Sequence, residues 1–247
     1  MAAPDSLLFP TMMSWLRTLA NRDEDEGAFG RHAVLLGSLV LLLVALPVLQ
    51  IAIGRSAGFS PMLAIVVVAS VFVNSHQRGV FTVAIVLGVM SVSGFALVEM
   101  TGTESVRLLA ELAALGLLGL TTLVMLNSLI QADHVSRDTI VGGICVYLLV
   151  GLCFAMAFIA LAQIDPSAFA SDGAPIAAED PSRRATKLLY FSFVTLTTLG
   201  YGDIAPKSDL AQMFAVSEAL IGQLYLTIFV ARLVALYVGR KRSDPTV

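Results

Sequence analysis

The stretch that decides the fold is Thr195-Leu196-Thr197-Thr198-Leu199-Gly200-Tyr201-Gly202-Asp203. Two glycines flank Tyr201, and glycine adopts left-handed backbone without a Cβ clash. A segment in which left-handed residues alternate with ordinary ones can turn its carbonyl oxygens to one side. Such a row of oxygens, together with a threonine hydroxyl, can replace the hydration shell of a cation. The stretch therefore favours a cation-binding strand over an ordinary Gly-Tyr-Gly-Asp turn.

The composition around this stretch is that of an integral membrane protein. Of the 247 residues, 57% are hydrophobic and 13% are charged, which is far more apolar than a soluble domain. The net charge of -3 is spread between apolar runs, so no nucleic-acid partner is expected. Cys145 and Cys153 are eight residues apart in one apolar run, where we expect neither a disulfide nor a metal site. No catalytic constellation is present, so we expect a protein that is not an enzyme.

The apolar runs predict an all-α integral membrane fold with six transmembrane helices. They cover about residues 33–53, 61–74, 80–98, 106–130, 140–162 and 210–239. About 20 apolar residues cross a bilayer core of about 30 Å, so residues 187–197 are too few and predict a re-entrant pore helix. The polar segment 163–186 between them is predicted to be a mobile, exposed outer loop.

The orientation follows from the basic residues in the flanks. One side has Arg17, Arg22, Arg31, Arg78, Arg137, Arg240, Lys241 and Arg242, and the other has Arg55 and Arg107. Cytoplasmic flanks carry the excess of Lys and Arg, so we expect a multi-pass protein of the cell membrane with both termini in the cytoplasm. Asp203 and the polar segment then face outward.

Residues 195–203 resemble the selectivity filter of potassium channels, and we call them the filter segment. The match is the full Thr-x-x-Thr-x-Gly-Tyr-Gly-Asp pattern between two long apolar runs, and the resemblance covers roughly residues 140–242. It implies a homotetramer, because one chain supplies one filter strand and a fourfold pore needs four. It also implies passive conduction of potassium ions, with no small-molecule substrate.

The resemblance also assigns roles within the filter segment. Potassium ions are expected at the Thr198 hydroxyl and at the carbonyls of the next residues, Leu199, Gly200 and Tyr201, with Leu199 standing where Val or Ile is more familiar. Support is expected from Thr195, Thr197, Gly202, Asp203 and Tyr190. Tyr190 and Phe191 replace a Trp pair that many of these channels carry, and Val194 replaces a carboxylate. We therefore expect the Tyr190 hydroxyl to hydrogen-bond Asp203, because a buried phenol usually has a partner.

The last apolar run supplies the candidate gate. Gly222 lies where simple potassium channels have a hinge glycine, although a packing glycine is the alternative. At helical spacing from it, Leu226, Val230, Val234 and Val238 are expected to line the cavity and a cytoplasmic constriction that closes by dewetting. The alternative is that some of these four pack against residues 140–162.

Two ionisable residues in the same run are candidate regulatory positions, because charges within the bilayer are costly. Glu218 is expected behind the pore helix, protonated or hydrogen-bonded, on Thr195 or Thr197, or else exposed to a water-filled crevice. Arg232 is expected either to reach the cytoplasmic interface or to pair with Asp133 or Asp138.

The first four runs form a four-helix unit without the charges of a voltage sensor. Arg107 and Arg137 have no Lys or Arg between them, and steep voltage gating needs several arginines crossing the field. The expected organisation is a cytoplasmic segment 1–31, a four-helix unit 32–138, a pore domain 139–239 and a short cytoplasmic tail 240–247. Two alternatives stay open, namely a weakly selective cation channel and a channel whose four-helix unit senses a ligand, lipid, tension or pH.

Two features at the ends of the predicted spans have a structural explanation as well as a functional one. Residues 1–20 are either an interfacial helix or a disordered tail. His32, His76 and His134 each flank a predicted span on the cytoplasmic side. We prefer the interpretation that they are solvated flank residues over the alternative that they form a pH sensor.

Overall fold

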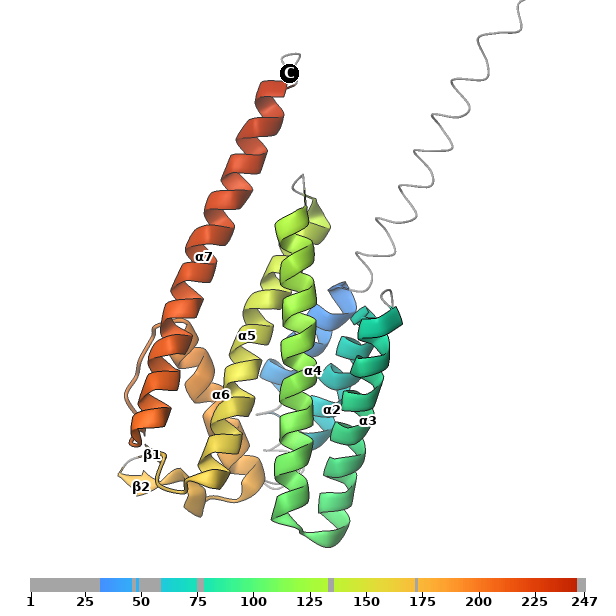
Figure 1. Cartoon of the computed structure of the whole chain (residues 1–247). Helices are drawn as coiled ribbons and strands as arrows, with labels where there is room; N and C mark the ends of the chain where they lie inside the picture. The colour runs from blue at the N-terminus through green and yellow to red at the C-terminus, as the bar shows by residue number, and fades with distance from the viewer. Residues whose placement is uncertain are drawn as a thin grey trace, which may run out of the picture.

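The structure is a computed structural model that describes residues 32–45, 48, 59–74, 78–132, 136–171 and 173–243. The predicted N-terminal helix, His76, Asp133 and His134 lie outside these residues. Within them the chain is a bundle of helices with one small sheet at the end away from the C-terminal end of α7, which was predicted to be the outer end (Figure 1).

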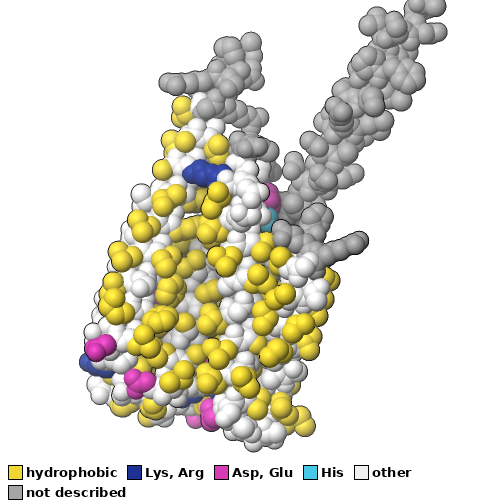
Figure 2. Space-filling model, viewed as in Figure 1, with side chains coloured by type: hydrophobic (Ala, Val, Ile, Leu, Met, Phe, Trp, Pro, Cys, Tyr) yellow, Lys and Arg dark blue, Asp and Glu magenta, His cyan; other side chains and the backbone are white. Residues whose placement is uncertain are grey.

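Each of the six apolar runs contains a helix. The four-helix unit comprises His32–Ala45, α2 (Phe59–Val73), α3 (Arg78–Thr101) and α4 (Glu104–Gln131), and the rest comprises α5 (Arg137–Ile164), α6 (Pro181–Leu196) and α7 (Asp209–Ser243). Of the described helices, α3, α4, α5 and α7 are long and apolar enough to cross a membrane, whereas His32–Ala45 and α2 are shorter apolar helices. Hydrophobic side chains cover the middle of the face in Figure 2, and charged ones lie toward its two ends. The chain is therefore a multi-pass membrane protein.

Local sequence accounts for the helix starts. α5 begins with a capping box, in which the Ser136 hydroxyl accepts from the Thr139 amide at 3.1 Å and the Thr139 hydroxyl accepts from the Ser136 amide at 3.3 Å. α6 begins with Pro181, which lacks an N–H, and an N–H in the first turn of a helix has no partner within the helix. α2 begins at Phe59, two residues before the predicted apolar run, and carries Pro61 in its first turn.

The core centres on α5, which packs between the four-helix unit and α6. Leu149, Leu152 and Met156 of α5 are fully buried. Next to them, Phe158, Phe169 and Phe191 form a cluster of edge-to-face rings with centroids 5.2 to 5.6 Å apart. This cluster ties α5, the outer segment and α6 into one packed unit.

The outer segment is partly buried where it was predicted to be exposed, and the described chain is not purely helical. β1 (Phe169–Ser171) pairs antiparallel with β2 (Ala174–Pro175) on one edge and with β3 (Ile204–Pro206) on the other. The Lys207 amide also donates to the Ala168 carbonyl at 2.7 Å. The predicted exposure is wrong for Ala168, Phe169 and Ile176, which are buried, and their burial favours a packed segment.

At the base of this segment, Asp165 is held by its neighbour Ser167. The Ser167 hydroxyl donates to Asp165 Oδ1 at 2.6 Å and the Ser167 amide donates to the same atom at 3.0 Å. The hydroxyl bond first, and the amide bond with it, keeps the pKa of the exposed Asp165 carboxyl below its ordinary value.

Candidate functional site

The filter segment begins at the carboxyl end of α6 and has an alternating backbone. Thr198, Gly200 and Gly202 have φ values of 57°, 58° and 80°, in the left-handed region, and no other described residue from Leu196 to Asp203 has a positive φ. The glycines were expected from the sequence, whereas the left-handed Thr198 was not. Every second residue is therefore inverted, which is the pattern that turns successive carbonyls to one side.

Main-chain hydrogen bonds fix the inner end of the segment to α6. The Leu199 amide donates to the Val194 carbonyl at 2.9 Å, and the Thr198 amide donates to the Thr195 carbonyl at 2.9 Å. The Thr197 hydroxyl folds back onto the Phe193 carbonyl at 2.7 Å. The last carbonyls of α6 thus lie directly beside Thr198.

Aromatic stacking and a carboxylate support the outer end. The rings of Tyr190 and Tyr201 stack at a centroid distance of 6.5 Å and an interplanar angle of 5°. The Asp203 carboxyl lies near the Tyr190 hydroxyl and interacts with it. Leu199 and Tyr201 are otherwise exposed at the surface of the single chain.

Glu218 lies behind α6, and its partner is Ser192, not Thr195 or Thr197. Ser192 Oγ lies 2.5 Å from Glu218 Oε1 and 2.6 Å from the Gly151 carbonyl oxygen. The serine hydroxyl has one proton and the carbonyl can only accept, so both contacts are hydrogen bonds when the carboxyl carries a proton and donates it to Ser192. Glu218 is fully buried, so the alternative of exposure to a water-filled crevice is wrong, and a neutral acid fits that burial.

Gly222 lies where α7 crosses the end of α6. A Cβ at this position would lie 2.4 Å from the Leu196 carbonyl oxygen, and α7 continues through Gly222 without a break. The Tyr147 hydroxyl of α5 donates to the same carbonyl at 3.4 Å. Close packing at Gly222 therefore holds three helices together near the inner end of the filter segment.

The residue after Gly222 reaches the filter segment and was missed by the sequence analysis. Gln223 Nε2 donates to Thr198 Oγ1 at 3.1 Å. Gln223 precedes Leu226 by three residues and Val230 by seven, so helical spacing already puts it on the face of the candidate gate. That spacing was the signal that could have identified it.

The four candidate gate residues are exposed in the single chain. Leu226, Val230, Val234 and Val238 lie on a face of α7 that does not pack on α5. The contacts with α5 come from Tyr225, whose hydroxyl donates to the Gly143 carbonyl at 2.7 Å, and from Phe229, whose ring lies against Gly143. The alternative of packing against α5 therefore does not hold for these four residues.

Arg232 binds the end of α4, and the predicted pairing with Asp138 is wrong. Its guanidinium donates to the carbonyls of Leu129, Ile130 and Ala132, the latter two at 2.8 Å. Asp138 instead lies 2.7 Å from His32 Nδ1. Unpaired carbonyls at a helix end attract a cation, and Arg232 satisfies them with several donors at once.

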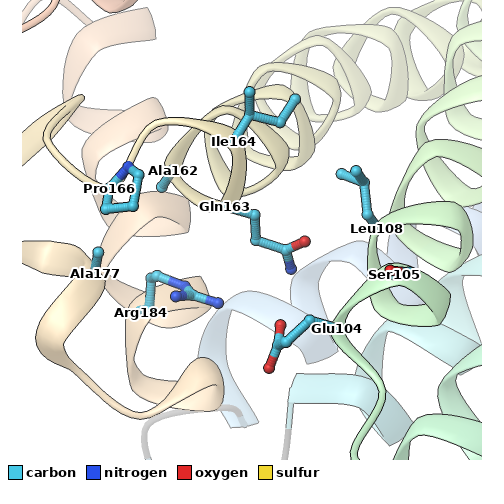
Figure 3. A pocket seen from close by; sticks show the side chains of 9 residues that line it. All are labelled: Glu104, Ser105, Leu108, Ala162, Gln163, Ile164, Pro166, Ala177 and Arg184. Carbon is cyan, nitrogen blue, oxygen red and sulfur yellow. The ribbon is translucent and has the colours of Figure 1, made fainter.

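A cluster of polar side chains fills the outer junction between the four-helix unit and α6. Glu104, Gln163 and Arg184 extend toward one another in a cavity of about 430 Å³ (Figure 3). Gln163 Nε2 donates to Glu111 Oε1 at 2.9 Å, while Glu111 Oε2 and Arg184 Nε have no hydrogen-bond partner among the described residues. No group of three or more metal-binding side chains occurs in the described ranges.

Comparison with known proteins identifies the domain that contains this site. Residues 145–238 match the family model described as ion channel. The human voltage-gated delayed rectifier potassium channel KCNH5 is 50% identical over 42 residues, which are 17% of this chain and 4% of that protein. The two pore potassium channel c of Oryza sativa subsp. japonica is 40% identical over 55 residues, which are 22% of this chain and 12% of the relative.

These relatives are matched over a small fraction of their own length. The rat voltage-gated delayed rectifier potassium channel KCNH1 is also matched over a short stretch, with 44% identity over 52 residues, which are 5% of the length of that relative. The family match nevertheless extends from α5 through the filter segment to α7. Residues 145–238 therefore match an ion-channel domain, which indicates a channel protein and not an enzyme.

Proposed function

We propose that this protein is a potassium-selective channel that conducts passively through a homotetrameric pore in the cell membrane, with both termini in the cytoplasm. The observation that carries the proposal is the alternation of left-handed residues at Thr198, Gly200 and Gly202 next to the carboxyl end of α6. In this proposal, potassium ions bind to the Thr198 hydroxyl and to the carbonyls of the next residues, Leu199 to Tyr201. The matched relatives are potassium channels by name.

The surface of the single chain supports the tetramer. Met213, Leu220, Leu224 and Ile228 are large apolar side chains on α7 and are more than half exposed, as are Leu199 and Tyr201 beside the filter segment. In a fourfold assembly, neighbouring chains cover these surfaces and complete the ring of oxygens around the ion. The single strand of each chain cannot surround a cation by itself.

The orientation of α6 supports selectivity for a cation. Its carboxyl end lies at the inner end of the filter segment, where the helix dipole places partial negative charge. Tyr190, Tyr201 and Asp203 brace the opposite end of the segment. A braced strand keeps its carbonyls at the spacing that a potassium ion needs.

The charge content of α4 supports gating by a stimulus other than voltage. Arg107 lies in the first turn of α4, where its Nε is 3.5 Å from Oε2 of Glu104. No other Lys or Arg occurs in this helix. Moving one elementary charge through 100 mV is worth about 2.3 kcal/mol, so a helix with no basic residue beyond its first turn gains little from the field. The four-helix unit is then a scaffold or a sensor of another stimulus.

Ion flux through the purified protein tests the proposal. Reconstituted into liposomes without a partner, the full chain is expected to pass potassium and rubidium and to exclude sodium. Equal sodium flux would establish the weakly selective cation channel instead. A steep conductance–voltage curve in symmetrical potassium, with an effective gating charge above about four per tetramer, would overturn the assignment of non-voltage gating.

A further inference from the structure

Gln223 is the one described side chain of α7 that hydrogen-bonds a side chain of the filter segment. Its amide Nε2 lies 3.1 Å from Thr198 Oγ1, across 25 residues of sequence. The Gln223 main chain is held in regular helix, where its carbonyl accepts from the Thr227 hydroxyl at 2.8 Å. The neighbouring Gly222 packs against Leu196, so the distance between α7 and the filter segment is fixed at this level.

This bond determines which way the Thr198 hydroxyl is turned. A hydroxyl has one proton and two lone pairs, and an amide N–H takes one of the lone pairs. The second lone pair is then free for a cation, and the proton must point elsewhere. Without the amide donor the hydroxyl is free to rotate and can direct its proton toward the ion, which opposes binding.

Thr198 is also the place where this control matters most. Its backbone has a φ of 57°, which is costly for a β-branched residue and persists only when the surroundings hold it. The α6 carbonyls fix its amide through Thr195, and Gln223 fixes its side chain from the opposite side. The residue is therefore held at both its main chain and its side chain.

We propose that Gln223 is a positioning residue for the innermost cation site, and that it orients the Thr198 hydroxyl so that its oxygen faces the ion. This inference rests on the proposed function, because it concerns an ion in the filter segment. In the tetramer, four Gln223 amides ring the inner mouth of the filter, one beside each Thr198. The site of an ion arriving from the cytoplasm is then set by α7 as well as by the filter segment.

Block by barium from the cytoplasmic side tests the role of Gln223. Ba²⁺ is close to K⁺ in size with twice its charge, and from that side it meets Thr198 first. The full chain in planar bilayers is compared with Gln223→Met, which keeps the length of the side chain and removes the donor. We expect the variant to conduct potassium with a Ba²⁺ affinity about tenfold weaker, because each lost hydrogen bond leaves an ion ligand unoriented.

Gln212→Leu is the matched control, because Gln212 lies on the same helix near its outer end and donates weakly to the Lys207 carbonyl at 3.5 Å. Its Ba²⁺ affinity is expected to equal that of the wild type. Thr198→Ala combined with Gln223→Met is expected to be no weaker than Thr198→Ala alone, since both changes act through one hydroxyl.

The outcomes separate the two proposals. Wild-type protein that passes no potassium refutes the channel function, and this inference with it. Potassium-selective wild-type protein with unchanged Ba²⁺ affinity in Gln223→Met refutes the inference alone. Full additivity in the double variant also refutes it, and it does so even where Gln223→Met lowers the stability of the protein.

Discussion

Replacing Gly222 with alanine separates close packing from hinge motion at the centre of α7. An alanine Cβ would lie 2.4 Å from the Leu196 carbonyl oxygen, so either α7 or the end of α6 must shift. Overpacking of this kind costs about 1 to 3 kcal/mol, whereas replacing a helical glycine with alanine gains about 1 kcal/mol. If Gly222 were a hinge without close packing, its replacement by alanine would show only the gain in helix stability.

Gly119→Ala is the reference for this gain. Gly119 lies within α4, and no atom meets a Cβ there within 4 Å. Both variants obtain the same helix propensity, so the difference between their unfolding free energies isolates the contact with Leu196. We expect Gly222→Ala to be less stable than Gly119→Ala by about 1 to 3 kcal/mol.

The assay is chemical unfolding of the purified variants in detergent micelles, followed by potassium flux in liposomes. Gly119→Ala should unfold at higher denaturant than the wild type and keep its flux. Gly222→Ala should unfold earlier and lose flux, because the shift reaches the inner end of the filter segment. Equal stability of the two alanine variants would refute close packing at Gly222.

Three further substitutions have expected outcomes. Arg232→Leu should lower the unfolding free energy by roughly 2 kcal/mol, because it leaves carbonyls of α4 without their charged donor, and Arg232→Lys should restore only part of it. Ser192→Ala should lower the unfolding free energy by about 1 to 3 kcal/mol, because it leaves the Glu218 carboxyl without a hydrogen-bond partner. Glu218→Gln keeps a neutral side chain and should lower it much less. Equal losses of unfolding free energy in the two variants would contradict a protonated Glu218. Asp165→Asn should remove an acid-sensitive part of stability. The pKa is lowered in the folded protein, so the contribution is complete above the ordinary value of about 3.9 and is lost as the pH falls through the lowered pKa, which unfolding curves from about pH 6 down to about pH 2 would reveal.

The sequence predicted those features that local chemistry imposes. Glycine at two alternate positions permitted left-handed backbone, and the structure has it at both. Long apolar runs predicted helices, because an uncharged segment in lipid must satisfy its own backbone. The pore helix was predicted over residues 187–197, and α6 begins earlier, at Pro181, six residues before that apolar run.

The sequence did not predict partners that depend on how helices meet. Arg232 binds main-chain carbonyls, which every helix end has and no sequence pattern marks. Glu218 was placed behind α6, but its partner is one helical turn earlier than expected, at Ser192 and not at Thr195. The strands of the outer sheet are two or three residues long, too short for any periodicity.

The small outer sheet makes the segment before α6 sensitive to its length more than to its composition. Its pairing uses main-chain atoms, so most substitutions within β1, β2 and β3 leave the hydrogen bonds of the sheet in place. Inserting or deleting one residue is different, because a one-residue slip exchanges the two faces of a strand and would turn the buried Ile204 outward. Natural variation in this part of the chain is therefore expected as amino-acid replacements within a fixed spacing, with added residues confined to the turn between β1 and β2.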